Sequence, residues 1–517
     1  MTFEIVFVLL SLLGMVAALI ADKMRPGMIL FSVVVLFLCA GILTPKEMLE
    51  GFSNKGMITV ALLFLVSEGI RQSGTLGQVI KKLLPQGKTT VFKAQLRILP
   101  SVAFISAFLN NTPVVVIFAP IIKHWAKSVN LPATKFLIPL SYVTILGGIC
   151  TLIGTSTNLV VHGMILEAGF EGFSMFELGK VGIFIAIAGI IYIFLFSKRL
   201  LPDARPDTAV PDEEVEEGEK LHRVEAVLGA RFPGINKKLK DFNFQRHYGA
   251  EVKEIKTRNG QRFVTNLDDV VLHEGDTLVV MADDTFIPTW GESSVFVLLT
   301  NGNEPDTSGK KKRWFALLLL VLMIVGATVG ELPITKEMFP DIKLDMFFFV
   351  SITTIIMAWT NLFPARKYTK YISWDILITI ACAFAISKAM VNSGVADSVA
   401  KFIIGLSDDY GPHVLLAMVF IITNLFTELI TNNAAAALAF PLALSISAQL
   451  GVSPTPFFVV ICMAASASFS TPIGYQTNLI VQGIGNYKFT DFVRIGLPLN
   501  IITFLISITL VPLIWSF

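Results

Sequence analysis

An internal repeat decides how this chain is organised. The motif TLIGTSTNLVVHG, residues 151–163, recurs as TPIGYQTNLIVQG, residues 471–483, at an offset of 320 residues. The pair Ser73-Gly74 recurs at residues 393–394, at the same offset. Shared offsets of this kind predict two copies of one structural unit, carried by the two halves of the chain.

The composition is that of a membrane protein. Of the 517 residues, 54% are hydrophobic and 15% are charged, whereas roughly a quarter are charged in ordinary soluble domains. The formal net charge of +2 produces no global positive field, so we expect no nucleic-acid partner. The four cysteines show no CxxC spacing and the histidines form no HExxH motif, which disfavours a disulfide framework, a structural zinc site and a zincin.

Ten apolar runs are long enough to cross a hydrocarbon core of about 30 Å, which takes about 20 helical residues. Two further apolar stretches, 94–127 and 412–449, break at an Asn pair into arms of about 15 residues. We interpret both as re-entrant hairpins, because non-helical backbone at membrane depth is tolerated only where it is buried or lines a watery cavity. The ten runs lie near residues 3–21, 28–44, 55–71, 134–166, 178–197, 313–330, 345–360, 372–391, 455–485 and 492–515.

Each membrane half, 1–199 and 313–517, contains an odd number of spans, so the second copy must be inverted relative to the first. In each half a hairpin precedes a broken helix, at 134–166 and at 455–485. Inverted repeats with broken helices that meet near the midplane are the architecture of secondary transporters. We therefore predict a mainly α integral membrane protein, an inverted-repeat transporter of ten spans with two re-entrant hairpins.

The distribution of basic residues sets the expected orientation. Lysines and arginines gather in the loops that would face the cytoplasm if both termini lie outside. The first hairpin then enters from the cytoplasm and the second from outside. We expect a multi-pass protein of the cell (plasma or inner) membrane, with the lipid bilayer as its surroundings.

The segment between the membrane halves has a different character. Residues 200–220 form an acidic linker, residues 221–288 a small cytoplasmic α+β domain, and residues 289–312 a linker that returns to the membrane. The expected strands lie near 224–228, 250–255, 263–264 and 277–281, with a helical turn at 235–239 after Pro233-Gly234.

The polar tips of the hairpins predict a binding site. At each tip the second arm begins a helix, whose free N–H groups and positive dipole end attract an anion. Carbonyl and side-chain oxygens just before the tip suit a small hard cation such as Na⁺. No Lys or Arg lies at the tips or at the helix breaks. An anionic substrate would therefore depend on dipoles, neutral donors and co-bound cations.

On these motifs the chain resembles the divalent anion:sodium symporter family (SLC13-like), which includes sodium/dicarboxylate and sodium/sulfate transporters. The resemblance implies one Na⁺ at each tip, an elevator-type movement of the hairpin-bearing core, and a homodimer. It implies a first Na⁺ site of Ser106, Asn110, Asn111 and Gly154, and a second of Thr427, Ile430 through its backbone, Asn432 and Gly474. It places the substrate on Asn111, Thr112, Thr155, Asn432, Asn433, Tyr475 and Gln476.

The sequence departs from the family pattern at the tips. Asn110 stands where the family has Ser, Asn433 where it has Thr, and Gln476-Thr477 where it has a Pro pair. The extra donors favour a compact oxyanion such as sulfate over a dicarboxylate. Glu428, beside Thr427, has two open interpretations, as support for the cation site or as a structural hydrogen-bonding group.

The soluble segment resembles the regulator of potassium conductance C-terminal module (TrkA-C, RCK-C). The resemblance rests on Gly234, on Tyr248-Gly249 and on the turn LHEGDTL at 272–278. It implies dimerisation and, in some members, binding of small ligands. The alternative is a domain that stabilises a homodimer without sensing anything.

The leading expectation is Na⁺-coupled symport of a small divalent anion. We do not expect an enzyme, because no nucleophile, base and orienting group converge in the sequence. The alternatives are a dicarboxylate transporter, or a ligand-gated ion channel or anion sensor regulated by the soluble module. A channel would be expected to carry a TVGYG-like filter loop, and the sequence has none.

Overall fold

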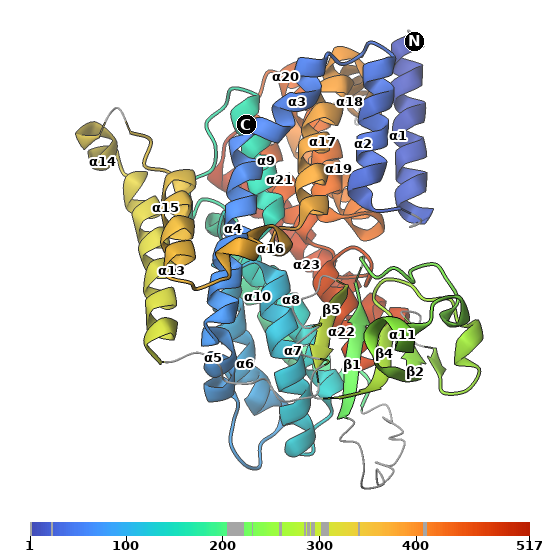
Figure 1. Ribbon diagram of the computed structural model, residues 1–517. Coiled ribbons are helices and arrows are strands. Elements are labelled where there is room, and N and C mark those ends of the chain that lie inside the picture. Colours follow the sequence, from blue (N-terminus) through green and yellow to red (C-terminus); the bar gives the residue numbers. More distant parts are fainter. Residues whose placement is uncertain are drawn as a thin grey trace, which may run out of the picture.

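The computed structural model describes residues 3–21, 24–203, 222–229, 231–257, 261–283, 286, 290, 295–300, 310–339, 342–406 and 411–517. Most of the acidic linker and much of the return linker therefore lie outside the described residues. Both chain ends lie at one end of a helical bundle, and a small sheet lies toward the other end (Figure 1).

The two halves of the chain have corresponding helices. In both halves a long helix turns into a short one at a left-handed glycine, Gly74 (φ 71°) or Gly394 (φ 76°), a conformation that only glycine adopts without strain. The first half contains α1 (Phe3–Ala21), α2 (Pro26–Cys39), α3 (Pro45–Glu50), α4 (Lys55–Gln72), α5 (Thr75–Leu83), α6 (Val91–Ser106), α7 (Asn111–Ser128), α8 (Leu137–Gly148), α9 (Ser156–Glu167) and α10 (Gly179–Leu200).

From α17 onward, the helices of the second half correspond in order to those from α4 onward in the first half. Its helices are α13 (Lys310–Gly330), α14 (Pro333–Met338), α15 (Met346–Trp359), α16 (Tyr368–Tyr371), α17 (Trp374–Asn392), α18 (Val395–Leu406), α19 (Gly411–Leu429), α20 (Asn432–Leu450), α21 (Thr455–Ser466), α22 (Gln476–Gly485) and α23 (Phe489–Ile514).

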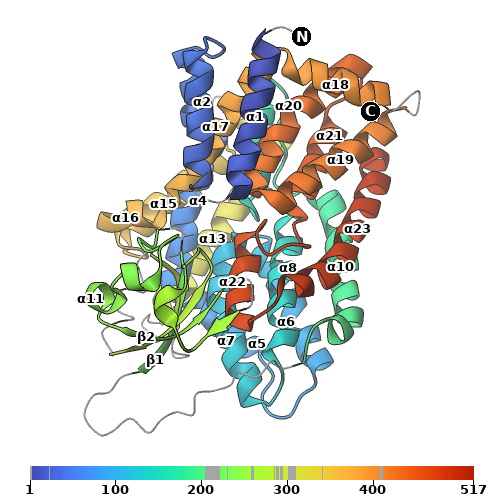
Figure 2. The same cartoon turned by 90° about the vertical axis from the view of Figure 1, so that its right-hand side faces the viewer.

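The two predicted hairpins correspond to the helix pairs α6–α7 and α19–α20. Figure 1 shows α6 and α7 at the end that carries the sheet, and α19 and α20 at the end that carries both termini; Figure 2 gives the same picture from the side. The two pairs thus approach the middle of the bundle from opposite ends. Their arms have 16 and 18 residues in the first pair and 19 each in the second, longer than the expected 15 or so.

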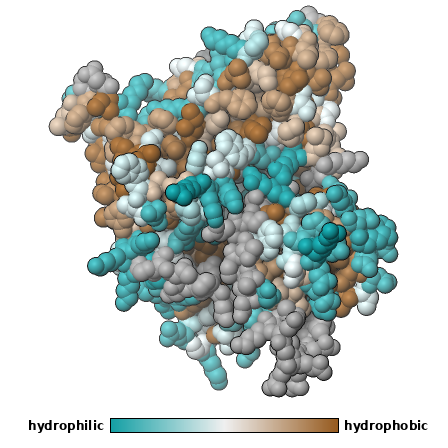
Figure 3. Space-filling model, viewed as in Figure 1, coloured by the Kyte–Doolittle hydropathy of each residue, from teal (hydrophilic) through white to brown (hydrophobic). Residues whose placement is uncertain are grey.

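Eight helical segments among the described residues are long and apolar enough to cross a membrane. Six of the ten expected runs are among them. Two of the others, α2 and α15, are helices of only 14 residues, and the two broken helices are divided at their breaks, into α8–α9 and α21–α22 of 12, 12, 12 and 10 residues. The remaining two of the eight are α19 and α20, the arms of the second predicted hairpin, which the sequence analysis expected to be too short to span. Figure 3 shows hydrophobic side chains over α13, α15 and the upper helices, and hydrophilic ones around the sheet. The eight are α1, Pro45–Gln72, α10, α13, α17, α19, α20 and α23.

The soluble segment forms an antiparallel sheet of order β3-β2-β4-β1-β5. The fifth strand lies within the segment expected to be a linker. The predicted helical turn at 235–239 is wrong: Asn236 adopts φ 61°, which interrupts a right-handed helix. The helical pieces lie later, at Leu239–Asp241 and α11 (Phe244–Tyr248). The strands are β1 (His222–Leu228), β2 (Glu251–Lys256), β3 (Arg262–Phe263), β4 (Thr277–Ala282) and β5 (Phe296–Thr300).

The sheet packs directly on the membrane helices. Lys123 on α7 places its Nζ 2.9 Å from the Glu225 carboxylate of β1, and Lys256 approaches the same carboxylate at 3.5 Å. At a second contact, a Cβ added to Gly483 on α22 would lie 2.6 Å from the Thr277 hydroxyl of β4. The sheet is therefore joined to the second arm of the first hairpin and to the second broken helix.

Candidate functional site

The repeated asparagines hold the two helix breaks open. Asn158 Nδ2 donates to the Thr151 carbonyl at 2.9 Å, and Asn478 Nδ2 donates to the Thr471 carbonyl at 3.1 Å and to the Ser468 carbonyl at 2.8 Å. An unwound buried backbone leaves carbonyls without helical partners, and such groups must be satisfied. The most strongly repeated residue of the sequence thus satisfies backbone carbonyls at the breaks.

Each break is also tied to the tip of its own hairpin by a threonine. The Thr151 hydroxyl donates to the Ala107 carbonyl in the first half, and the Thr471 hydroxyl donates to the Glu428 carbonyl at 2.9 Å in the second. These bonds align the hairpin tip with the break. They explain how each hairpin tip and the helix break that follows it in the chain come to lie side by side.

The first predicted Na⁺ site gathers around the tip of α6–α7. Ser106 Oγ donates to Asn111 Oδ1 at 2.8 Å, and both side chains are fully buried. Gly154 closes the group: a Cβ there would lie 2.5 Å from the Gly148 carbonyl oxygen and 3.0 Å from that of Ala107. Only glycine leaves room for this approach.

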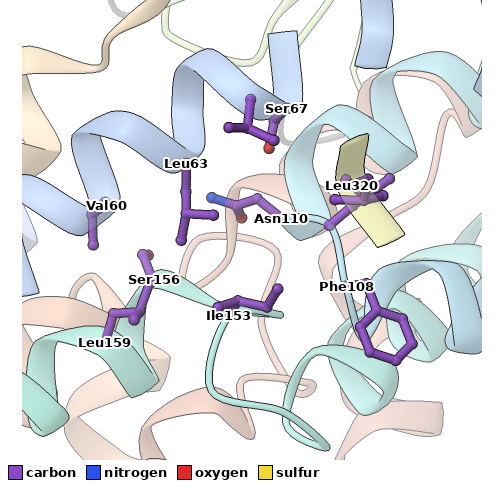
Figure 4. Close-up of a pocket in the computed structure, with 11 residues that line it drawn as sticks. Val60, Leu63, Ser67, Phe108, Asn110, Ile153, Ser156, Leu159 and Leu320 are labelled. Carbon is purple, nitrogen blue, oxygen red and sulfur yellow. The ribbon is translucent and has the colours of Figure 1, made fainter. Parts of the chain in front are cut away.

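Asn110, the remaining member of the predicted first site, is half-buried. It lines a small cavity of about 10 Å³ with Ser156 of α9 and Leu63 of α4 (Figure 4), and no described bond joins it to Ser106 or Gly154. The structure therefore brings Ser106, Asn111 and Gly154 together and places the Asn110 side chain at an adjoining cavity.

The second predicted Na⁺ site repeats this geometry at the tip of α19–α20. Thr427 Oγ1 lies 3.0 Å from Asn432 Oδ1, to which it donates, just as Ser106 does to Asn111. A Cβ on Gly474 would lie 2.3 Å from the Thr427 carbonyl oxygen. Ile430 is buried at the tip.

Two further groups belong to this second cluster and escaped the sequence analysis. The Ala465 carbonyl oxygen lies 2.6 Å from Thr427 Oγ1 and shares the single proton of that hydroxyl with Asn432 Oδ1, and the Ser468 hydroxyl donates to the Thr427 carbonyl at 3.2 Å. The sequence signal that could have predicted these groups is the pair of serines at 466 and 468, where α21 ends, because hydroxyls are unusual at the end of an apolar helix.

The predicted substrate residues meet around the Tyr475 hydroxyl. It accepts a 2.6 Å hydrogen bond from Asn111 Nδ2, lies 3.0 Å from Thr155 Oγ1 and lies near the Asn432 side chain. Tyr475 is 8% exposed. One phenol oxygen therefore links the first hairpin tip to the first helix break, beside Asn432 of the second tip.

The other predicted substrate residues cross the same interface between the halves. Asn433 Oδ1 accepts from Thr157 Oγ1 at 3.3 Å, and Thr112 Oγ1 donates to Gln476 Oε1 at 3.4 Å. All seven residues thus lie in one region built by both repeats. Within these described contacts every side chain is neutral, so the region offers dipoles and hydrogen bonds to an anion.

A wide vestibule leads toward this region from the end of the molecule that carries the termini. It has a volume of about 1050 Å³ and is lined by residues of α4, α9 and the α14–α15 region, including Asn54, His162 and Asp345. Leu159 lines both this vestibule and the small cavity at Asn110. The vestibule and the first hairpin tip are therefore neighbours.

Comparison with known proteins identifies the family. A family model described as "Citrate transporter" (CitMHS) matches residues 16–449, with a second match over residues 344–517. An uncharacterized transporter of Synechocystis sp. is 30% identical, over 94% of this chain and 93% of that protein.

Relatives whose names state a substrate include two proteins of Chlamydomonas reinhardtii. Probable sodium/sulfate cotransporter 3 is 23% identical over 93% of this chain and 85% of its own length. Sodium/sulfate cotransporter 2 is 31% identical over 54% of this chain and 31% of its own length. Because the family model spans most of the chain, this protein belongs to the CitMHS citrate transporter family, as a membrane transporter of the divalent anion:sodium symporter type.

Proposed function

We propose that the protein is a Na⁺-coupled secondary active symporter of a small divalent anion, with sulfate favoured over a dicarboxylate. The observation that carries the proposal is the neutral network around Tyr475, which joins the first hairpin tip and the first helix break to the second helix break. Such a network recognises an anion by hydrogen bonds and helix dipoles.

Cation coupling follows from the energetics of this neutral site. A divalent anion buried among neutral donors loses its hydration without gaining an opposite charge, which costs several kcal/mol. Na⁺ at the clusters of Ser106 and Asn111 and of Thr427 and Asn432 would supply that charge close to the anion. Substrate and cation binding are then mutually dependent.

Two similar clusters suit two Na⁺ ions. In each, a hydroxyl and an asparagine oxygen five residues apart meet at 2.8 or 3.0 Å, next to the carbonyls that Gly154 or Gly474 allows to approach. Hydroxyl, amide and carbonyl oxygens are the ligands of a hard cation. Their pseudo-equivalence supports one ion per hairpin.

Two arguments favour sulfate as the substrate: the donors of the site and the names of the relatives. Closely spaced donors for a compact tetrahedral oxyanion come from Thr155, Tyr475 and Gln476. In addition, relatives are named as sodium/sulfate cotransporters. A dicarboxylate is the second candidate, because the matching family model is described as a citrate transporter.

We further propose that the hairpins and broken helices move as one unit against α4, α13 and α15. The vestibule borders both groups, because its lining includes residues of α4 and α15 as well as residues of α9. We place the termini outside and the sheet in the cytoplasm, consistent with their opposite ends in Figure 1. A homodimer, and ligand sensing by the TrkA-C-like sheet, remain predictions.

Uptake of sulfate into proteoliposomes tests the function. We expect rapid uptake with an inward Na⁺ gradient and background uptake when choline replaces Na⁺. Equal rates in the two cations would remove Na⁺ coupling. Competition with thiosulfate, succinate, malate and citrate separates the two substrate classes, because a dicarboxylate transporter would show stronger inhibition by succinate than by thiosulfate.

A further inference from the structure

A separate polar cluster adjoins the second hairpin and joins α19, the break before α22, and α23. Glu428 Oε1 accepts hydrogen bonds from the Ser470 backbone N–H at 2.8 Å and from Asn500 Nδ2 at 2.7 Å. The same amide nitrogen donates to Ser470 Oγ at 2.8 Å. None of these three residues belongs to the Na⁺ or substrate sites proposed above.

The cluster lacks a positive charge. In the part of the chain that the structure describes, Glu428 forms no ion pair, and its Oε2 is buried without a hydrogen-bond partner. Asn500 is 6% exposed, and its Oδ1 is likewise buried and unpartnered among the described atoms. A carboxylate buried among neutral donors is costly, and a nearby cation removes that cost.

The first repeat lacks an equivalent of this cluster. Equivalent glycines fix the alignment of α10 with α23: a Cβ on Gly182 would lie 2.7 Å from the Ile149 carbonyl oxygen, and one on Gly496 would lie 2.0 Å from that of Phe469. Four residues further along these two helices lie Ala186 and Asn500.

The other two members of the cluster also have apolar or weakly polar counterparts. Glu428 pairs with residue 107 at the offset of 321 that relates Asn432 to Asn111, Ser470 pairs with residue 150 at the offset of 320, and the glycine alignment pairs Asn500 with residue 186. The first half carries no carboxylate, amide or hydroxyl side chain at these three positions. The counterparts of Glu428, Ser470 and Asn500 are Ala107, Cys150 and Ala186. The polar trio is therefore particular to the second repeat, which points to a role in binding rather than in the shared scaffold.

The geometry indicates what the cluster binds. The Asn500 amide nitrogen, the positive end of that side chain, occupies the point where the Glu428 and Ser470 oxygens converge. Rotation of the amide by half a turn exchanges nitrogen for oxygen in nearly the same shape. Carboxylate, hydroxyl and amide oxygens would then surround one position, a ligand set that suits a hard monovalent cation better than a transition metal.

We propose that Glu428, Ser470 and Asn500 form a third Na⁺ site, distinct from the sites at the two hairpin tips. The inference rests on the proposed function, because a Na⁺ bound here travels with the second hairpin and the substrate. Two Na⁺ with one sulfate carry no net charge, so a third Na⁺ makes each transport cycle carry one positive charge. The site would therefore couple sulfate uptake to the membrane potential.

The first test measures Na⁺ binding without any anion. We would follow thermal unfolding of the purified full-length protein against Na⁺, with choline held at constant ionic strength. We expect Glu428→Gln and Asn500→Ala to raise the Na⁺ concentration for half-maximal stabilisation about tenfold or to reduce the stabilisation at saturation. Glu337→Gln, on the exposed surface of α14, is the control and should match the wild type.

The second test measures the ratio of Na⁺ to sulfate taken up by proteoliposomes. We expect Glu428→Gln to transport one Na⁺ fewer per sulfate and to lose the response to an imposed membrane potential. Unchanged Na⁺ titration in both variants, or an unchanged ratio in Glu428→Gln, would overturn the third site. Absence of wild-type sulfate uptake would instead refute the proposed function, and the Na⁺ titration would still decide on the site. If Glu428→Gln does not fold, Asn500→Ala and Ser470→Ala carry both tests.

Discussion

Asn111 Nδ2 donates a 2.6 Å hydrogen bond to the Tyr475 hydroxyl, across 364 residues of sequence. The bond joins the tip of the first hairpin to the break of the second repeat, and the same hydroxyl lies 3.0 Å from Thr155 Oγ1. Tyr475 therefore links the two halves at the candidate anion site.

Replacement of Tyr475 by Phe should weaken anion binding and the joint between the halves. The substitution removes the shared hydroxyl and leaves the buried Asn111 amide without an acceptor, which costs about 1–3 kcal/mol. We expect the KM for sulfate to rise about tenfold or more, the rise that corresponds to such a loss. Initial rates of uptake at varied sulfate give the value.

The matched control is Tyr192→Phe. The Tyr192 hydroxyl donates to the Ile495 carbonyl at 3.1 Å, away from both hairpin tips. This variant should lose a little stability and keep the wild-type KM. Equal changes of KM in the two variants would mean that Tyr475 acts only through general stability.

Alanine at Gly154 or Gly474 should weaken Na⁺ binding. A Cβ at Gly154 would lie 2.5 Å from the Gly148 carbonyl oxygen, and one at Gly474 2.3 Å from that of Thr427, so the break and tip must separate. We expect the Na⁺ requirement of uptake to shift by about tenfold or more in each variant, because misplaced cation ligands lose affinity steeply. Gly405→Ala on α18, which meets no atom within 4 Å, should leave Na⁺ dependence unchanged.

Substitution of Asn158 or Asn478 by Ala should lower stability. Each change leaves two buried carbonyls of a helix break without their donor, and each unmade bond costs about 1–3 kcal/mol. Thermal unfolding in detergent should show similar losses for the two variants, because their positions are pseudo-equivalent. A neutral result for either would contradict the structural role given to that asparagine.

Contact between the sheet and α7 should depend on pH through Glu225. Burial alone raises the pKa of the Glu225 carboxyl, but Lys123 and Lys256 outweigh it and lower the pKa to about 2. A lowered carboxyl pKa stabilises the folded state above the unfolded value of 4.5, and this stabilisation is lost as pH falls toward the folded value. We expect the docked sheet to loosen between about pH 4.5 and 2.

Hydrogen exchange of β1 in the full-length protein would measure that loosening. Glu225→Gln should give faster exchange at neutral pH and should remove most of the change between pH 4.5 and 2. A wild-type profile in this variant would show that the ion pair does not hold the sheet to α7. Glu251→Gln, at an exposed pair with Lys253 on β2, is the matched control.

The sequence predicted those features that are repeated or local. The offset between residues 151–163 and 471–483 indicated two equivalent units, and the breaks follow from glycine and proline within apolar runs. The strands β1, β2 and β4 were expected to within about two residues, because alternating burial is visible over a few positions.

Contacts between distant residues could not be predicted in the same way. The bonds of Tyr475 with Asn111 and Thr155 depend on how two inverted copies face each other, which no local pattern specifies. Asn158 was expected at the polar break, but its bonds to the Thr151 and Gly148 carbonyls require the unwound backbone itself. β5 was missed because its pairing with β1 depends on a partner about 70 residues earlier in the chain.

Cross-linking of the first hairpin tip to the second helix break tests the central claim most directly. Thr112 and Gln476 would be replaced by cysteine in a chain whose four native cysteines are replaced, and treated with a short bifunctional thiol reagent. We predict rapid cross-linking within one chain, slowed when sulfate and Na⁺ are present together but not by either alone. Absence of the cross-link, or protection by sulfate that is the same in Na⁺ and in choline, would contradict a Na⁺-dependent anion site where the two repeats meet.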